Sequence, residues 1–254
     1  MTPARKFLML GSLLAALGAA GWFTHQRPAA VAAEPLPAAS PAAAVADDGL
    51  SSRAVADNFT RATTQAERLK WVRQPDAVAA AMEPFFSSGK GAAEVVAKLD
   101  AIAPGSAGDL AYERFAVTMA DGTRRLLCLL PAAGGVRVDF KAYARHGSVA
   151  WSDLLGGQAK EAGEMRVFIE KGDYYNFGFK HEVRWQCLTA TTPDLDLPVW
   201  LYLARTDPAL KVLEETNSLK PLRVTVAVRA VGDSHLRRQF EIVAVHAVDW
   251  VVPD

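Results

Sequence analysis

The sequence predicts an α+β fold, in which helices and a three-stranded antiparallel meander precede a five-stranded antiparallel barrel with one helix. Three observations support this prediction. Apolar residues recur at helical spacing over residues 51–103, and the period shortens to two from Leu110 onward. Asp-Gly and Gly-Gly pairs divide this second part into short segments. Half of the 254 residues are hydrophobic, which is enough for one sizeable core or two small ones.

The first 26 residues have the layout of a membrane anchor or an export signal. Arg5 and Lys6 precede an uncharged apolar stretch over residues 7–23, and this arrangement directs the following chain across a membrane. The stretch is short for a membrane-spanning helix and long for a cleaved signal. We favour an uncleaved anchor. The alternative is cleavage within residues 30–32, which read Ala-Val-Ala, followed by secretion.

Residues 27–50 are a predicted spacer that is rich in alanine and proline. Proline fixes the backbone and removes a hydrogen-bond donor, and alanine side chains are too small to build a core. A spacer of this kind holds a folded module away from the membrane surface. We therefore expect the rest of the chain to lie in the cell envelope, outside the cytoplasm.

The charge balance gives no reason to expect a nucleic-acid partner. Beyond residue 26, 26 Lys and Arg residues stand against 28 Asp and Glu residues, a net charge of −2. Binding to nucleic acid depends on a basic surface that displaces counterions. The expected partners are the membrane, through the N-terminal segment, and a protein or another envelope component.

Residues 51–160 are predicted to form the first folded module, which begins with helices. Thr64 and Glu67 have the spacing of a capping box. Pro75 suits the first turn of the next helix, where its missing N–H costs nothing. Apolar spacing over residues 95–102 predicts a third helix.

A meander follows these helices. Alternating segments over residues 112–120 and 123–130 flank Asp121-Gly122, a favoured hairpin turn. Apolar and polar residues alternate again over residues 136–141, which predicts a third strand. Residues 148–155 are expected to form a short helix.

Residues 161–254 are predicted to form the second module, a barrel. Alternation of apolar and polar residues predicts five strands, over residues 165–169, 175–187, 199–203, 222–228 and 240–252. A helix that starts at Asp207-Pro208 is predicted between the third and the fourth strands. This element order resembles that of the OB fold, which implies a five-stranded barrel with a ligand-binding strand face.

Four segments of the sequence carry a resemblance to a protein family: ERLKWVRQPDAV, VRVDFKAYARHG, DYYNFGF and VDWVV. In these segments the chain resembles an uncharacterised family of membrane-anchored bacterial envelope proteins. The resemblance implies the organisation of anchor, spacer and folded module, and it implies no chemistry.

Four aromatic residues are candidate ligand contacts: Tyr174, Tyr175, Trp185 and Trp200. OB-like barrels bind ligands on an aromatic strand face, on which rings stack. The simpler interpretation is that Tyr175 and Trp185 share the inward parity with Phe177 and fill the barrel. Tyr174 has the opposite parity and is the better candidate for an exposed contact.

The sequence contains no motif that predicts catalytic residues, a metal site or a cofactor. Asp194 and Asp196 form a carboxylate pair, but they lie in a proline-flanked loop where aspartates are ordinary turn formers. His246 is expected to be a buried core histidine. The leading hypothesis is a non-enzymatic module that binds a protein or an envelope component. The alternatives are a hydrolase-like enzyme with a site assembled from scattered residues, and a structural subunit of an envelope assembly.

Cys128 and Cys187 are predicted to be buried thiols, although the expected compartment permits a disulfide. Each lies in a strand segment that reads as buried, and the two segments belong to different predicted modules. Two separately packed cores would bring the sulfur atoms into bonding geometry only by chance.

Overall fold

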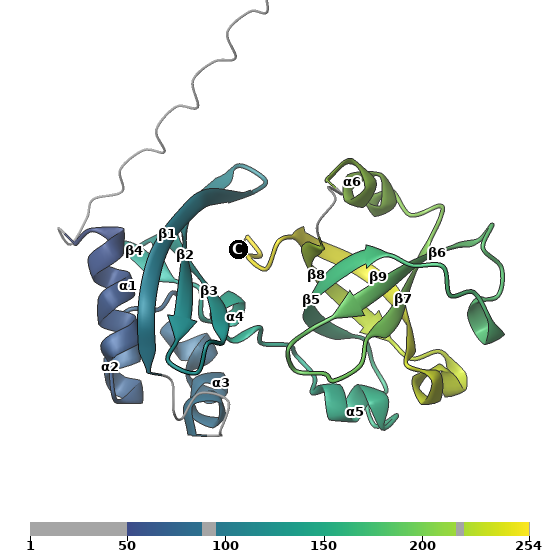
Figure 1. Cartoon of the computed structure of the whole chain (residues 1–254), viewed down its shortest axis with the longest axis horizontal. Coiled ribbons are helices and arrows are strands. Elements are labelled where there is room, and N and C mark those ends of the chain that lie inside the picture. The colour runs from purple at the N-terminus through teal and green to yellow at the C-terminus, as the bar shows by residue number, and fades with distance from the viewer. Residues whose placement is uncertain (1–49, 88–94, 217–220, 254) are drawn as a thin grey trace, which may run out of the picture. The chain divides into compact units, whose positions relative to one another are not determined.

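A computed structural model describes residues 50–87, 95–216 and 221–253 of the chain (Figure 1). The predicted anchor over residues 1–26 lies outside these ranges, and so does the predicted spacer except for Leu50. Within the described ranges, the helices are too short or too polar to cross a membrane.

Three helices open the described chain, and they are α1 (Ser52–Arg61), α2 (Gln65–Leu69) and α3 (Pro75–Ser87). The Ser51 side chain caps α1. Thr64 and Glu67 form the predicted capping box at the start of α2, and Pro75 is the first residue of α3, as expected.

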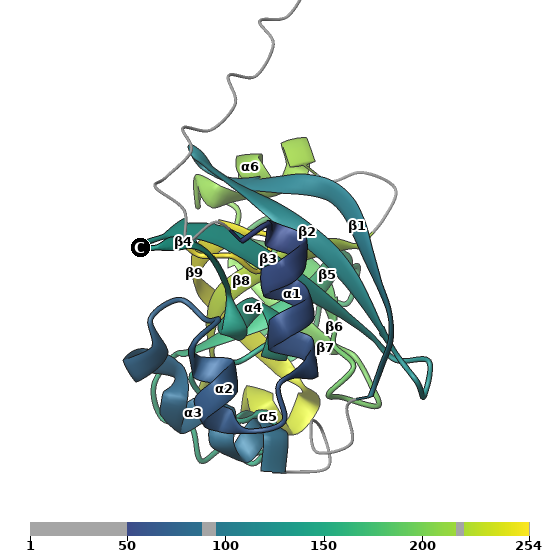
Figure 2. The same ribbon diagram turned by 90° about the vertical axis from the view of Figure 1, so that its left-hand side faces the viewer.

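The helices precede an antiparallel sheet in which the strands are neighbours in chain order, namely β1 (Val96–Ala107), β2 (Leu110–Met119), β3 (Arg124–Ala132) and β4 (Gly135–Val138). The predicted Asp-Gly turn joins β2 to β3, with Gly122 at a φ of 83°. Thr123 donates its backbone N–H to the Asp121 carboxylate over 2.8 Å. Figures 1 and 2 show α1 lying against one face of this sheet.

The third predicted helix is wrong, because the residues that follow Val95 form β1. This strand is also the reason why the sheet has four strands and not the predicted three. Its helical spacing does not mark a buried face, since Val95 is 64% exposed, Ile102 is 40% exposed and only Leu99 is buried. Pairing with β2 along most of β1 satisfies the backbone and outweighs the local pattern.

The last predicted strand of the meander is shorter than expected, since β4 ends at Val138. Asp139 stops it by capping helix α4 (Phe140–Ala144), where its carboxylate accepts the N–H of Ala142 over 2.9 Å. Phe140 is buried in the helix instead of the strand. Helix α5 (Trp151–Leu155) falls within the predicted range.

The second half of the described chain forms a closed five-stranded barrel. Its strands are β5 (Gly163–Lys171), β6 (Trp185–Thr191), β7 (Val199–Ala204), β8 (Leu222–Arg229) and β9 (Gln239–Val248). Helix α6 (Ala209–Thr216) lies between the third and the fourth strands in the sequence. Around the barrel the order is β5–β6–β7–β9–β8. The prediction of a fully antiparallel barrel is wrong, because β7 and β9 are parallel. A closed ring with an odd number of strands requires at least one parallel pair.

The second predicted barrel strand starts ten residues later than expected, at Trp185. The preceding residues, 172–184, form a loop that contains the short helix η1 (Phe177–Phe179). Phe177 has a φ of 49°, which is incompatible with a strand, and it is 54% exposed. The sequence alternation in this loop therefore does not mark one face of a sheet.

The barrel core contains every second residue of its strands, for example Leu188, Leu201 and Val226. Trp185 has the opposite parity in β6, so it faces outward and does not fill the barrel as the simpler interpretation expected. His246 is exposed, which contradicts the expected buried histidine. The reason is a register shift in the β8–β9 pairing: Val245 and Val248 pack against the core, and His246 is the extra residue that no β8 residue opposes.

The predicted boundary between the two modules, at residues 160 and 161, falls between α5 and β5, and it stays a prediction. One hydrophobic cluster contains residues from both sides of it. Trp250 and Val251, which follow β9, pack with Leu126 and Cys128 of β3.

Both cysteines are free and buried, as predicted. Cys128 belongs to the cluster that β3 forms with Trp250, whereas Cys187 belongs to an aromatic cluster on the barrel. Burial raises the pKa of both thiols, so neither forms the reactive thiolate readily.

We expect thiol titration of the denatured, non-reduced protein to count two reactive thiols, and titration of the native protein to count none. Burial and the raised pKa values protect both groups while the fold is intact. Mass spectrometry under non-reducing conditions is the control. An intramolecular Cys128–Cys187 cross-link in the protein as isolated would contradict the structure.

Candidate functional site

An aromatic cluster covers the outer face of β6 and β7. Its buried members include Phe179, Trp185 and Tyr202. Tyr202 stacks on Phe179, with ring centroids 4.0 Å apart and planes inclined by 4°. The loop between β5 and β6 supplies Phe179, so this loop packs onto the outside of the barrel.

The structure brings all four predicted aromatic residues into this cluster, but it gives them different environments. Trp185 is 7% exposed, and the hydroxyl of Tyr175 accepts the backbone N–H of Cys187 over 3.1 Å. These two residues support the fold. Tyr174 and Trp200 are half-buried and stack on each other, with centroids 4.3 Å apart. This pair offers a ligand a stacked ring surface that is not tied to the barrel backbone through a side-chain hydroxyl.

Two further residues lie at this surface: Phe177, which the sequence pattern placed inside the barrel, and Arg237, which no sequence signal singled out. The Arg237 guanidinium lies 4.0 Å above the Phe177 ring, a cation–π contact. Arg237 belongs to η2 (Gly232–Arg237) in the loop between β8 and β9. No local pattern predicts this contact, because closure of the barrel brings the two loops together.

A hydrogen-bond network holds the β5–β6 loop against the barrel. Gln239 on β9 donates to the Tyr202 hydroxyl over 2.7 Å and to the Asn176 side chain over 3.2 Å. The Tyr202 hydroxyl in turn donates to the backbone oxygen of Tyr174 over 2.6 Å. The stacked Tyr174–Trp200 pair is thereby positioned by buried side chains.

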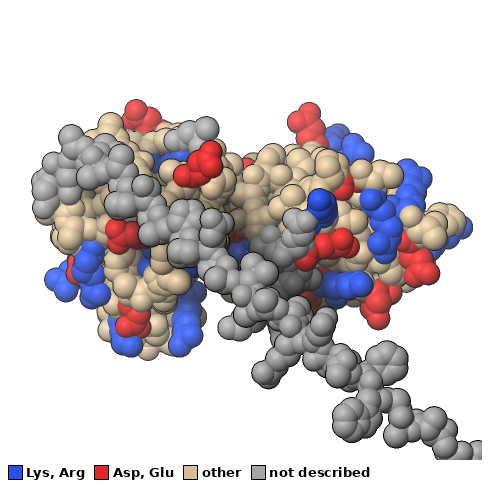
Figure 3. Space-filling view, turned by 90° about the horizontal axis from the view of Figure 1, so that it is seen from above, with Lys and Arg blue, Asp and Glu red and all other residues tan. Residues whose placement is uncertain are grey.

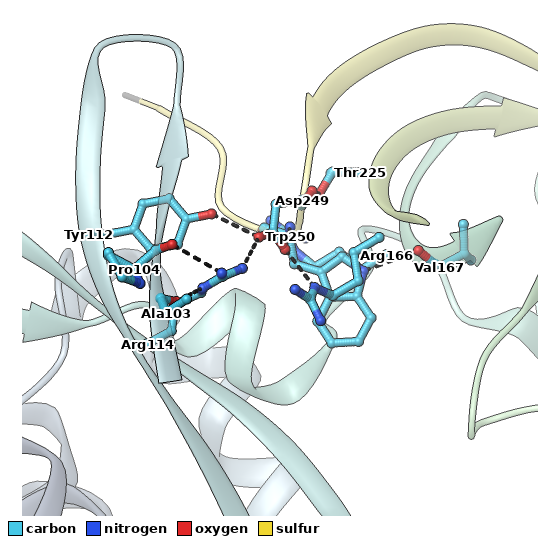
Figure 4. Close-up of polar contacts among 10 residues, drawn as sticks. Ala103, Pro104, Tyr112, Arg114, Arg166, Val167, Thr225, Asp249 and Trp250 are labelled. Atoms are coloured by element: carbon cyan, nitrogen blue, oxygen red, sulfur yellow. Dashed lines mark hydrogen bonds and ion pairs between the residues drawn. The ribbon is translucent and has the colours of Figure 1, made fainter. Parts of the chain in front are cut away.

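A second polar region surrounds Asp249, directly after β9 (Figure 4). Its carboxylate accepts hydrogen bonds from Tyr112 over 3.0 Å, from Arg114 over 3.1 Å and from Arg223 over 2.9 Å. Tyr112 and Arg114 come from β2, and Arg223 comes from β8. We call this group the Asp249 junction, since it joins the sheet to the barrel.

The backbone prepares the positions of these groups. Asp249 has a φ of 104°, an unusual value for a residue other than glycine. A bulge in β1 lets Ala103 and Pro104 offer their carbonyl oxygens to the Arg114 guanidinium, over 2.7 and 3.0 Å. Gly105 leaves room for the Tyr112 ring, which any side chain there would meet.

Electrostatics favours a neutral Tyr112. The Asp249 side chain is only 12% exposed and forms ion pairs with two guanidinium groups. Burial, and next the Asp249 charge, raise the pKa of Tyr112. The phenol therefore keeps its proton and donates a hydrogen bond to the Asp249 carboxylate.

The residue after Asp249 is fastened to β5. Trp250 donates its indole N–H to the backbone oxygen of Val167 over 3.2 Å, and its own backbone oxygen accepts the Arg166 side chain over 2.9 Å. The Arg166 side chain is 2% exposed and is paired with Glu164. The VDWVV segment thus forms hydrogen bonds both to β2 of the sheet, through Asp249, and to β5 of the barrel, through Trp250.

A groove of about 830 Å³ lies next to the Asp249 junction. Its lining includes four arginines and three aromatic residues: Arg124, Arg125, Arg145, Arg223, Phe85, Phe168 and Trp250. By contrast, Lys and Arg are interspersed with Asp and Glu on the face of the molecule shown in Figure 3. The groove thus concentrates positive charge within a mixed surface.

The carboxylate pair considered from the sequence does not converge on a site. Asp194 lines the groove and lies 3.5 Å from the Arg145 guanidinium. Asp196 is exposed. Across the described part of the chain, no group of three or more His, Cys, Asp and Glu side chains is arranged to hold a metal ion.

The chain matches no protein-family model, no curated protein and no solved structure.

We expect Asp249→Asn to lower the free energy of unfolding by about 2–3 kcal/mol, because it removes the charge that compensates two partly buried guanidinium groups. Urea denaturation measures this change. Asp233→Asn is the matched control, since Asp233 is exposed in η2 and its substitution should change stability by less than about 0.5 kcal/mol. Equal unfolding midpoints for the two variants would contradict the role of the Asp249 junction.

Proposed function

We propose that this chain is a membrane-anchored, extracytoplasmic binding module, and that its barrel binds a glycan-bearing component of the envelope. The binding surface is the outer face of β6 and β7 together with the β5–β6 and β8–β9 loops. The proposal combines the anchor and spacer predicted from the sequence with the aromatic surface of the barrel.

The barrel is best classed as OB-like. Its strands run first, second, third, fifth and fourth around the ring, and the helix lies between the third and the fourth. OB folds bind oligosaccharides and oligonucleotides on the second and third strands and on the loops that join strands one to two and four to five. In this chain these are β6, β7, the β5–β6 loop and the β8–β9 loop.

The observation that carries the proposal is the half-exposed Tyr174–Trp200 stack on this face. Flat aromatic rings provide apolar area at little entropic cost when they are already held in place. Phe177 and Arg237 extend the same surface. A sugar ring can pack on the stack, while its hydroxyl groups hydrogen-bond to the polar loop residues.

A glycan fits this surface better than a nucleic acid does. The chain beyond residue 26 has a net charge of −2, and binding to a phosphate backbone needs a basic surface. We favour binding over an enzyme because the predicted aromatic residues gather at one surface. The polar residues considered for catalysis do not gather at one site: Asp194 lies beside Arg145, whereas His246 is exposed on β9.

We expect the full chain in detergent to bind a soluble hexamer of β-1,4-linked N-acetylglucosamine, as measured by isothermal titration calorimetry. Trp200→Ala should weaken binding by roughly tenfold or more, because it removes one ring of the stack. Trp200→Phe should retain most of the affinity. Tyr175→Phe is the control, since within the described residues the Tyr175 hydroxyl bonds to the barrel backbone, at the N–H of Cys187.

Two outcomes would overturn the glycan proposal. One is a native chain that does not bind the hexamer. The other is equal affinity in the Trp200→Ala and native proteins, with unchanged circular dichroism spectra.

The localisation has its own test. A periplasmic-activity reporter fused after Leu50 should be active only outside the cytoplasm, because Arg5 and Lys6 retain the N-terminus inside. A fusion that lacks residues 1–26 is the control and should be inactive. Activity of a cytoplasm-specific reporter at the same position would refute export.

A further inference from the structure

We infer that the groove beside the Asp249 junction is a second binding site, and that it takes an organic anion: a carboxylate or phosphate group carried on an apolar or aromatic body. This site is separate from the aromatic surface of β6 and β7. Its volume of about 830 Å³ falls in the range of small-molecule sites, roughly 300–1,000 Å³.

The groove borders the C-terminal segment on the sheet. On the sheet face opposite the helices, Trp250 and Val251 pack with Cys128 and Leu126. Leu126 also lines the groove, together with its cross-strand neighbour Ala116, which is partly exposed. The groove therefore offers a ligand a small apolar sheet surface between the hairpin turn and Trp250.

The charges that line the groove favour an anion. Four arginines face two aspartates, and both aspartates interact within the fold. The Asp121 carboxylate accepts the backbone N–H and the hydroxyl of Thr123 in the hairpin turn. Asp194 pairs with Arg145, and Arg223 is paired with Asp249 at the junction. Arg124 is exposed and forms no ion pair with any described residue, so the groove retains an excess of positive charge.

Two of the four guanidinium groups lie near aromatic rings that line the groove. Arg125 lies 4.8 Å from the centroid of Phe85, and Arg223 lies 5.9 Å from that of Trp250. Stacked guanidinium groups are pre-organised, and their fork geometry matches carboxylate and phosphate oxygens. The same rings, with Phe168, offer apolar walls for the body of the ligand. Because guanidinium groups and apolar rings line the same groove, we expect an amphipathic anion and not a simple inorganic ion.

The probe is 1-naphthyl phosphate, titrated into the full chain in detergent and monitored by the fluorescence of the naphthyl group. Inorganic phosphate has the anionic group without the apolar body, and 1-naphthol has the apolar body without the anionic group. We expect 1-naphthyl phosphate to bind at least tenfold more tightly than either, and its affinity to fall as salt is raised.

Arg124→Glu tests the location of the site. We expect it to weaken binding of 1-naphthyl phosphate by roughly tenfold, because it reverses an unpaired charge at the groove without removing a contact within the fold. Arg61→Glu makes the same charge change at the exposed end of α1 and should leave affinity unchanged. Thermal unfolding of both variants shows whether the fold is intact.

The source of the anion is resolved by comparing 1-naphthyl phosphate with dihexanoyl phosphatidate. Tighter binding of the phosphatidate indicates a lipid headgroup with its chains, and tighter binding of the naphthyl compound indicates a free aromatic anion. Both results support the site. Trp200→Ala should leave these affinities unchanged, so the glycan proposal can fail without affecting this one.

The inference is overturned if 1-naphthyl phosphate binds no more tightly than inorganic phosphate. It is also overturned if Arg124→Glu and Arg61→Glu weaken binding equally, since the effect would then be one of net charge and not of the groove.

Discussion

The carboxylate of Asp249 is the interaction on which the arrangement of sheet, barrel and groove depends. It lies at the end of β9 and accepts hydrogen bonds from β2 and β8, so one side chain links two elements that are more than a hundred residues apart in the sequence. Without this charge, Arg114 and Arg223 would lose their common partner. Two hydrogen bonds accompany the positive φ of Asp249: its backbone N–H donates to the Arg223 carbonyl oxygen, and its carboxylate accepts the N–H of Trp250, each over 2.8 Å.

Closure of the barrel has an equally direct consequence for the proposed glycan surface. Five strands in a ring require one parallel pair, and β7 and β9 form it. This pairing places Gln239 beside Tyr202 and brings the loop that precedes β9 near the β5–β6 loop. The half-buried stack of Tyr174 on Trp200 therefore rests on buried contacts that the topology of the barrel creates.

Local signals explain which parts of the fold could be predicted from the sequence. The capping box at Thr64, the Asp121-Gly122 hairpin and the short alternating strands β5, β7 and β8 depend on neighbouring residues, and the structure contains each of them. Strand β1 was missed because its pairing with β2 is visible only in three dimensions. Alternation over residues 175–183 was misleading because Phe177 adopts a positive φ that no neighbouring residue demands.

The candidate sites divide in the same way. Tyr174 and Trp200 could be found, because aromatic residues near predicted strands are visible in the sequence. The Arg237–Phe177 contact and the Asp249 junction could not, since each joins residues that are distant in the chain. The arginines of the groove are likewise scattered over several elements.

The most direct measurement of the central claim is a hydrogen–deuterium exchange map of the full chain, with and without the N-acetylglucosamine hexamer. The proposed function predicts slower exchange in the β5–β6 loop, residues 172–184, and in the β8–β9 loop, residues 230–238, when the glycan is present. Unchanged exchange in both loops at a saturating glycan concentration, or protection confined to the sheet and its helices, would contradict it.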